Sequence, residues 1–102
     1  MKFVHNVAKS LDELRQSDQY WSSFIEKDNF EVGCLRLAPG QKDTQSPHKS
    51  DEIYFIISGD GFINIKNQDY VIRKNQSYYV PKNTNHHFHG NKEEILAFYV
   101  LN

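Results

Sequence analysis

The stretch Glu52-Ile-Tyr-Phe-Ile-Ile-Ser58 decides the fold of this chain. Most of its residues are β-branched or aromatic, and the run is too short for a typical helix, so we predict a buried strand. Alternate side chains of a strand face opposite sides. Glu52, Tyr54 and Ile56 should therefore share the inner face, while the residues between them pack on the other side.

Turn signals at regular intervals divide the rest of the chain into further short strands. We expect strands over residues 20–26, 30–37, 52–58, 62–66, 70–73, 77–80, 86–90 and 94–101. Eight short strands with this spacing are typical of a β-sandwich or β-barrel. Gly33 is expected to mark a β-bulge, because the apolar alternation shifts there.

The N-terminal part is expected to add one short helix to this all-β fold. Ser10-Leu-Asp-Glu13 resembles a capping box, which predicts a helix from Ser10 to about Asp18. The chain has 102 residues and no linker-like stretch, which favours a single domain. Residues 1–29, with the helix and the first strand, should thus belong to the same domain as the barrel of residues 30–102.

Composition excludes several classes of partner. The net charge is −1 with both signs mixed along the chain, which argues against a nucleic-acid or membrane-surface binder. No window is apolar enough for a transmembrane helix, and the N-terminus lacks the apolar core of a signal peptide. The single Cys34 cannot form an internal disulfide, which is consistent with the cytoplasm.

Three residues form a candidate metal site. His48 and Glu52 lie four residues apart at the start of the decisive strand, and His86 follows much later. Two imidazoles and one carboxylate can bind a divalent metal from one side and leave other coordination positions open. If His86 points inward, Phe88 follows it, whereas the neighbouring His87 and His89 point away; His5 is expected to be unrelated to the site.

The spacing of these residues resembles the two sequence motifs of the cupin superfamily. The first motif is carried by Gly40, Ser46, His48, Glu52 and Gly59, and the second by Pro81, Asn83, His86 and Phe88. The resemblance spans roughly residues 30–101 and points to the small, single-domain members with a conserved barrel. It implies a jelly-roll β-barrel holding one metal ion, and a homodimer, for which Tyr20, Trp21 and Phe24 are candidate interface residues.

The chain departs from the family pattern at four positions. Ser46 stands where the first motif has its first histidine, so the usual four ligands fall to three. Asn75 and Asn83 replace glycines of the second motif, a mild change because Asn tolerates left-handed backbone. Gly90 stands where the second motif has its final asparagine.

The predicted ligand pocket adds residues around the metal site. We expect it to be lined by Gln45, Ser46, Tyr54, Ile56 and Phe88. Gln45 reads as a loop residue, but a kink at Pro47 could turn it inward as a weak oxygen ligand. Catalytic residues are not identified; Tyr54 is a weak candidate, since a core aromatic with a satisfied hydroxyl is the commoner role.

Three functions fit this pattern. The first is a metal-dependent enzyme acting on a small, oxygen-rich organic molecule: a dioxygenase, or a lyase or isomerase that works through an enolate. The second is a non-catalytic module that binds or senses a small ligand, and the third is a protein with a vestigial site. The donor types suit Fe, Mn, Ni, Co or Zn, and the sequence does not choose among them.

Overall fold

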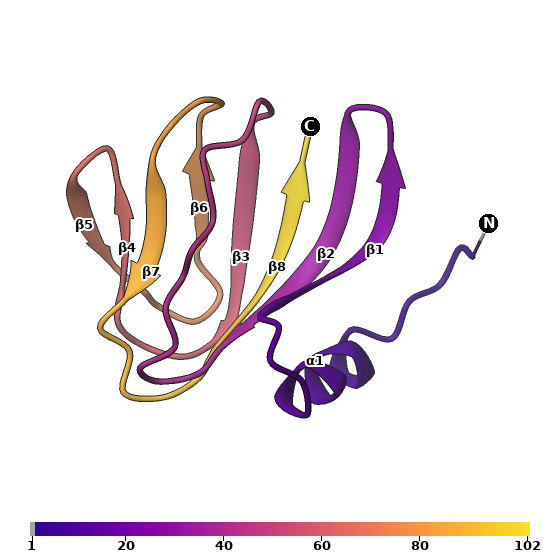
Figure 1. The fold of residues 1–102 in the computed structure, drawn as a ribbon, viewed down its shortest axis with the longest axis horizontal. Helices are drawn as coiled ribbons and strands as arrows, with labels where there is room; N and C mark the ends of the chain where they lie inside the picture. The colour runs from indigo at the N-terminus through magenta and orange to yellow at the C-terminus, as the bar shows by residue number, and fades with distance from the viewer. Residues whose placement is uncertain (1) are drawn as a thin grey trace.

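The computed structural model describes residues 2–102 and contains two antiparallel sheets (Figure 1). The five-stranded sheet has the order β1-β2-β8-β3-β6 and the three-stranded sheet the order β5-β4-β7. The elements are α1 (Val7–Arg15), β1 (Trp21–Lys27), β2 (Phe30–Leu37), β3 (Glu52–Ser58), β4 (Phe62–Ile65), β5 (Gln68–Val71), β6 (Ser77–Val80), β7 (His86–His89) and β8 (Ile95–Leu101).

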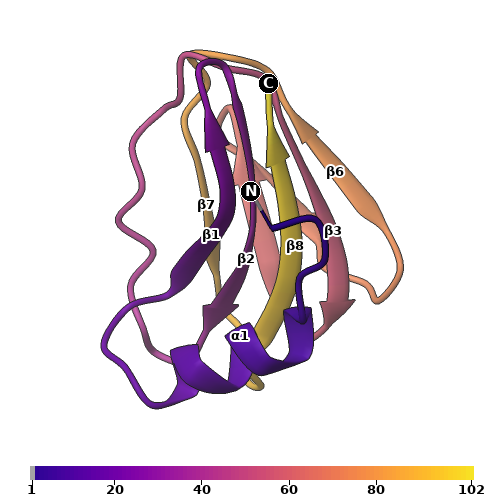
Figure 2. The same cartoon turned by 90° about the vertical axis from the view of Figure 1, so that its right-hand side faces the viewer.

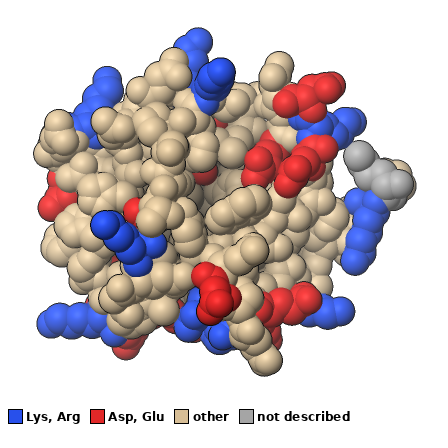
Figure 3. All heavy atoms as spheres, viewed as in Figure 1, with Lys and Arg blue, Asp and Glu red and all other residues tan. Residues whose placement is uncertain are grey.

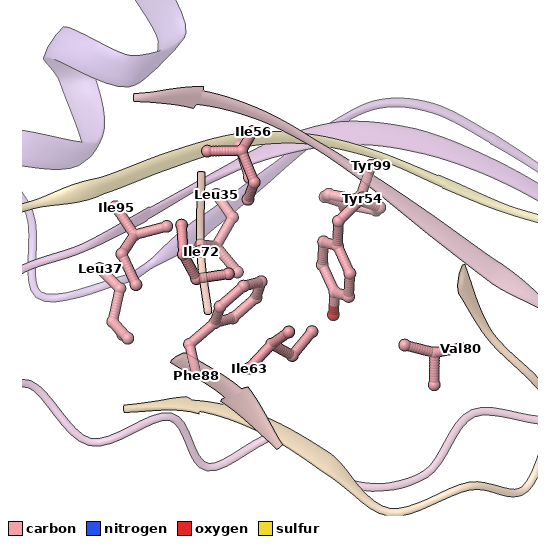
Figure 4. Packing of buried hydrophobic residues seen from close by; sticks show 11 residues of the cluster. Leu35, Leu37, Tyr54, Ile56, Ile63, Ile72, Val80, Phe88, Ile95 and Tyr99 are labelled. Carbon is pink, nitrogen blue, oxygen red and sulfur yellow. The ribbon is translucent and has the colours of Figure 1, made fainter. Parts of the chain in front are cut away.

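The main hydrophobic core fills the space between the two sheets (Figure 4). Strand β3 contributes Tyr54 and Ile56, and strand β7 contributes Phe88, all at most 2% exposed. Their inward orientation confirms the predicted alternation of both strands. The opposite face of β3 differs from the prediction of a fully buried strand, because Ile53 and Phe55 are 49% and 42% exposed.

A second, smaller core lies on the outer face of the five-stranded sheet. Leu11 and Leu14 of α1 pack there against Cys34 and Leu96, so the helix covers one end of that face (Figure 2). This helix has nine residues, and no helix within residues 2–102 is long and apolar enough to cross a membrane. An ion-pair cluster fastens it to the sheet: the carboxylate of Glu94 accepts hydrogen bonds from Arg15 of α1 and Arg36 of β2.

The predicted start and end of the helix were wrong. The helix begins at Val7 rather than at Ser10, because the Asn6 side chain caps it and accepts a hydrogen bond from the Lys9 amide at 3.0 Å. It ends at Arg15, three residues before the predicted end. An asparagine cap outside the capping-box pattern thus determined the register of the helix.

Two details of the strands also differ from the predictions. The bulge lies in β1 between Ser23 and Ile25, opposite Gly33, and not in β2 itself. Strand β5 begins at Gln68, two residues earlier than predicted, because Lys66 and Asn67 adopt positive φ and make a tight hairpin turn. The remaining strands end within about two residues of the predicted positions, the usual uncertainty of strand and helix ends.

Two asparagines occupy left-handed backbone as the sequence predicted. Asn75 has φ of 69° and Asn83 has φ of 58°, so both replace glycine at positions where glycine is favoured. The amide of Asn83 donates a hydrogen bond to the carbonyl of His48 at 2.6 Å. This turn therefore connects the loop before β3 to the loop before β7, from which the candidate ligands come.

Candidate metal centre

The three candidate ligands converge at one end of the space between the sheets. Glu52 is the first residue of β3, His86 is the first residue of β7, and His48 lies in the long segment that crosses the front of the molecule in Figure 1. One donor atom from each lies within 4.8 Å of the others. The Nε2 atoms of His86 and His48 lie 3.1 Å and 3.5 Å from Glu52 Oε1. These three residues form a candidate metal-binding triad.

The neighbours of His86 orient a lone pair toward the centre of the triad. Its Nδ1 lies 2.9 Å from the carbonyl oxygen of Thr84, which can only accept, so Nδ1 carries the ring proton. In the neutral ring, Nε2 then presents its lone pair to Glu52. Burial acts to lower the pKa of His86, but the Glu52 carboxylate and the Thr84 carbonyl outweigh it and raise that pKa.

Glu52 is buried with an unsatisfied oxygen. The residue is 3% exposed, and its Oε1 accepts no hydrogen bond from any residue between 2 and 102. The His86 ring lies close to it but directs its proton at Thr84. A buried carboxylate oxygen without a partner costs free energy, and a bound cation would remove that cost. The donors present therefore fit a divalent metal ion.

A fourth oxygen comes from Gln45. Its Oε1 lies 3.3 Å from His48 Nε2 and 3.2 Å from His86 Nε2. Its Nε2 donates to the carboxylate of Asp43 at 2.7 Å, which keeps the amide oxygen turned toward the triad. Asp43 is itself held by the backbone amide of Phe88 at 2.9 Å. Two nitrogens, one carboxylate oxygen and one amide oxygen thus surround the same point.

Tyr54 completes the polar side of the site. Its hydroxyl donates to Gln45 Oε1 at 2.9 Å, and its ring packs edge-on against Phe88 (Figure 4). Burial, followed by the Glu52 carboxylate, raises the pKa of Tyr54 well above its ordinary value. The hydroxyl therefore stays protonated and acts as a hydrogen-bond donor in this site.

The triad opens into a cavity of about 310 Å³. The residues lining it are Tyr20, Trp21, Glu31, Leu35, Gln45, Ser46, Pro47, His48, Glu52, Tyr54, Tyr99 and Leu101. Five of the predicted ligand and pocket residues line this cavity, and all five come from one stretch of sequence: Gln45, Ser46, His48, Glu52 and Tyr54. Ile56 and Phe88 instead lie in the hydrophobic core behind Tyr54, and His86 approaches the triad from the three-stranded sheet.

The remaining histidines lie away from the triad. His87 is exposed, and His89 pairs with Asp69 on the three-stranded sheet at 2.8 Å. The ring of His5 stacks on Phe24 at 5.3 Å, on the side of the sheet that α1 covers. All three positions agree with the predicted separation of these residues from the site.

Sequence reasoning missed several residues of this region, among them three with polar side chains. Asp43, Glu31 and Tyr99 are far from the two motifs in sequence or occupy a loop position without a pattern. Strand alternation gave a usable signal for Glu31, which shares a face with Gly33 and Leu35 on β2. The role of Asp43 depends on loop conformation, which no periodicity predicts.

Comparison with known proteins agrees with this architecture. The chain is 31% identical over 96 residues to an uncharacterised protein, SCO3923, of Streptomyces coelicolor, covering 90% of this chain and 91% of that protein. A conserved protein of unknown function from Streptococcus pyogenes, SPY1581, has a similar structure, with a TM-score of 0.73, 20% identity and coverage of 82% and 74% of the two chains.

A third similar structure is that of FeII HppE in complex with its substrate. The TM-score is 0.70 at 12% identity, and the match covers 80% of this chain and 52% of that one. A likeness at this identity supports the jelly-roll fold alone. The sequence model of the cupin domain matches residues 33–102, which include both motifs and every member of the triad. The chain therefore belongs to the cupin domain family.

Proposed function

We propose that this protein is a metal-dependent cupin that acts on a small, oxygen-rich organic molecule. The metal would be a divalent ion, Fe, Mn, Ni, Co or Zn, held by His48, Glu52 and His86. The observation that carries the proposal is the buried Glu52 oxygen, which has no hydrogen-bond donor among the described residues while a histidine lone pair faces it. Gln45 would supply an oxygen in place of the histidine that the family has at Ser46.

The proposed metal site lies next to a cavity that can hold a ligand. A bound divalent ion would supply Lewis-acid or oxygen-dependent chemistry to a ligand with adjacent oxygen atoms. Tyr54 would hold Gln45 in place and keep its own proton. The cavity is large enough for a small organic ligand, and its aromatic walls would pack against that ligand. The similar HppE structure contains Fe(II) and a substrate, which is compatible with a metal-dependent reaction in this fold. The choice between a dioxygenase and a lyase or isomerase stays open.

A non-catalytic module for ligand binding or sensing is the second candidate. This second candidate is supported by the hydrogen bonds of the polar groups around the cavity. The Tyr54 hydroxyl donates a hydrogen bond to Gln45, and the Glu31 carboxylate accepts a hydrogen bond from Tyr99. Apart from the three triad residues, Glu31 is then the one carboxylate among the described residues that line the cavity, and it lies across the cavity from the triad rather than beside it. Turnover would separate the two candidates, and oxygen uptake would separate a dioxygenase from a lyase or isomerase.

Elemental analysis tests the metal proposal directly. We expect about one equivalent of a divalent metal in untagged wild-type protein, and loss of that metal in His86→Ala. His87→Ala is the matched control, since the neighbouring ring is exposed and points away from the triad. Full metal content in His86→Ala, or no uptake by the wild type on reconstitution, would refute the assignment.

We also propose that the protein is a cytoplasmic homodimer. The interface differs from the one expected from the sequence, because Tyr20 and Trp21 line the cavity and Phe24 packs against the core beneath α1. The uncovered part of the outer face of the five-stranded sheet instead carries three large apolar side chains that are 42–57% exposed, Ile53, Phe55 and Tyr79. The segment before α1 presents Phe3 and Val4 to solvent as well. Sedimentation should give twice the chain mass, and Ile53→Glu should convert the dimer to a monomer. A monomeric wild type would exclude this interface.

A further inference from the structure

The wall of the cavity opposite the triad carries a carboxylate. Glu31 and Glu52 both pair with Leu101 of β8, one from each side, so the three residues form a row across β2, β8 and β3. Two strand spacings separate the two glutamates, which is roughly 10 Å between their backbones. A small ligand at the triad would therefore extend toward Glu31.

Tyr99 holds the Glu31 side chain in place, and it can do so because Gly33 has no side chain in its way. Tyr99 donates its hydroxyl proton to Glu31 Oε2 at 2.6 Å. The ring of Tyr99 reaches this position across Gly33, where an added Cβ would lie 2.7 Å from the tyrosine oxygen. Among residues 2–102, no other group donates a hydrogen bond to the Glu31 side chain. The carboxylate keeps capacity to accept further hydrogen bonds from a ligand.

The charges and rings of the cavity suit a cation. Two carboxylates line it, and none of its lining residues is Lys or Arg. Aromatic rings of Tyr20, Trp21 and Tyr99 form part of the cavity wall, and Tyr99 contacts Glu31 directly. Such rings attract cations through their faces. Asp and Glu side chains also gather over the upper parts of β1 and β2 (Figure 3). An anionic group placed beside Glu31 would meet the repulsion of that carboxylate.

We propose that Glu31 selects ligands that carry a protonated amine at the end opposite their metal-chelating oxygens. This inference rests on the proposed function, because the chelating end is assigned to the triad. The inference restricts the class of oxygen-rich ligands to those that also carry a positive charge. Glu31 would then determine the ligand specificity of the site. Tyr99 positions the Glu31 carboxylate without touching the chelating end.

Two catechols of the same size test the proposal. Dopamine and 3,4-dihydroxyphenylacetate share the chelating oxygens and differ in a terminal ammonium or carboxylate. Binding to Zn²⁺-loaded protein is measured at pH 7 by calorimetry without oxygen, and by fluorescence of Trp21, the single Trp of the chain and a residue of the cavity wall. Wild-type protein should bind dopamine at least about tenfold more tightly, as expected for one charge-assisted contact.

The variant Glu31→Gln should remove most of this preference. Glutamine can still accept the Tyr99 hydrogen bond, so the fold is expected to remain intact. Glu13→Gln on the exposed side of α1 is the control, because it makes the same change of net charge away from the cavity. Equal binding of the two catechols by the wild type, or an unchanged preference in Glu31→Gln, would overturn the proposal and leave metal binding standing.

A second arm separates this inference from the metal proposal. Phenethylamine and phenylacetate lack chelating oxygens and are compared on metal-free protein, with metal content measured on the same samples. An amine preference that Glu31→Gln abolishes would support amine selection even if no metal is taken up. A preference for phenylacetate, or none, would overturn the inference whatever the metal content.

Discussion

Replacing Asp43 by asparagine should weaken metal binding although Asp43 is not a ligand. The Asp43 carboxylate accepts three hydrogen bonds: from the side-chain and backbone amides of Gln45 at 2.7 Å and 3.2 Å, and from the backbone amide of Phe88 at 2.9 Å. All three partners are donors. Asparagine offers one acceptor and one donor, so in either orientation its own NH₂ group faces another N–H.

The expected magnitude follows from the orientation of Gln45. The simplest relief of the donor clash is rotation of the Gln45 amide, which would turn its NH₂ group toward the triad and remove one oxygen from it. Loss of a residue that orients a metal ligand typically weakens binding about 10–100-fold, which corresponds to about 1.4–2.7 kcal/mol. The lost hydrogen bond to a charged group should lower the free energy of unfolding by about 1–3 kcal/mol.

Competition titration of Zn²⁺ against a chromophoric chelator measures the change in affinity, and urea unfolding measures the change in stability. Asp60→Asn is the matched control. Asp60 accepts hydrogen bonds from the backbone amides of Lys92 and Glu93 at 2.9 Å and 3.0 Å, away from the triad. Both amides donate to the same oxygen, Oδ1, which asparagine can retain. Asp60→Asn should therefore lose only the charge assistance of these bonds and keep its metal affinity. Equal weakening of metal binding in both variants, or none in Asp43→Asn, would refute the orienting role of Asp43.

Three further predictions concern affinity and stability. Ser46→His should raise Zn²⁺ affinity in the same titration by restoring the family's fourth ligand, a third imidazole, and unchanged affinity would mean that position 46 does not reach the metal. Two arginines lower the pKa of Glu94 from 4.5 to about 2, chiefly through the hydrogen bond from the helix arginine; its stabilising effect is thus complete above pH 4.5 and disappears as the pH falls toward 2. Glu94→Gln should cost about 1 kcal/mol at pH 7, after allowance for solvent screening, and almost nothing near pH 2, whereas Glu93→Gln should change little in urea unfolding at either pH. Gly33→Ala should lower the free energy of unfolding by about 1–3 kcal/mol, because the new methyl group meets backbone and the Tyr99 hydroxyl; wild-type stability would show that this contact relaxes freely.

The strands could be predicted because their signal is local. Alternation in residues 52–58 correctly predicted that Glu52 and Tyr54 face inward, since each side chain alternates with its neighbour in any strand. Positive φ at Asn75 and Asn83 was also predictable, because it reflects an intrinsic preference of asparagine. The helix start was not, because Asn6 and Ser10 are both good caps, and in the structure it is the Asn6 side chain that caps the helix.

Period-two alternation and turn spacing by themselves predicted a sandwich or barrel. The resemblance of the motif spacing to the cupin superfamily then implied the jelly-roll class and supported His48, Glu52 and His86 as candidate ligands. Only the tertiary structure decided which atoms surround the centre. Gln45 turns inward because Asp43 holds its amide, and Glu31 faces the triad across β8. The orientation of Gln45 depends on the conformation of a loop, and the position of Glu31 depends on the pairing of strands that are distant in sequence. Strand periodicity carries no information about loop conformation or about strand pairing.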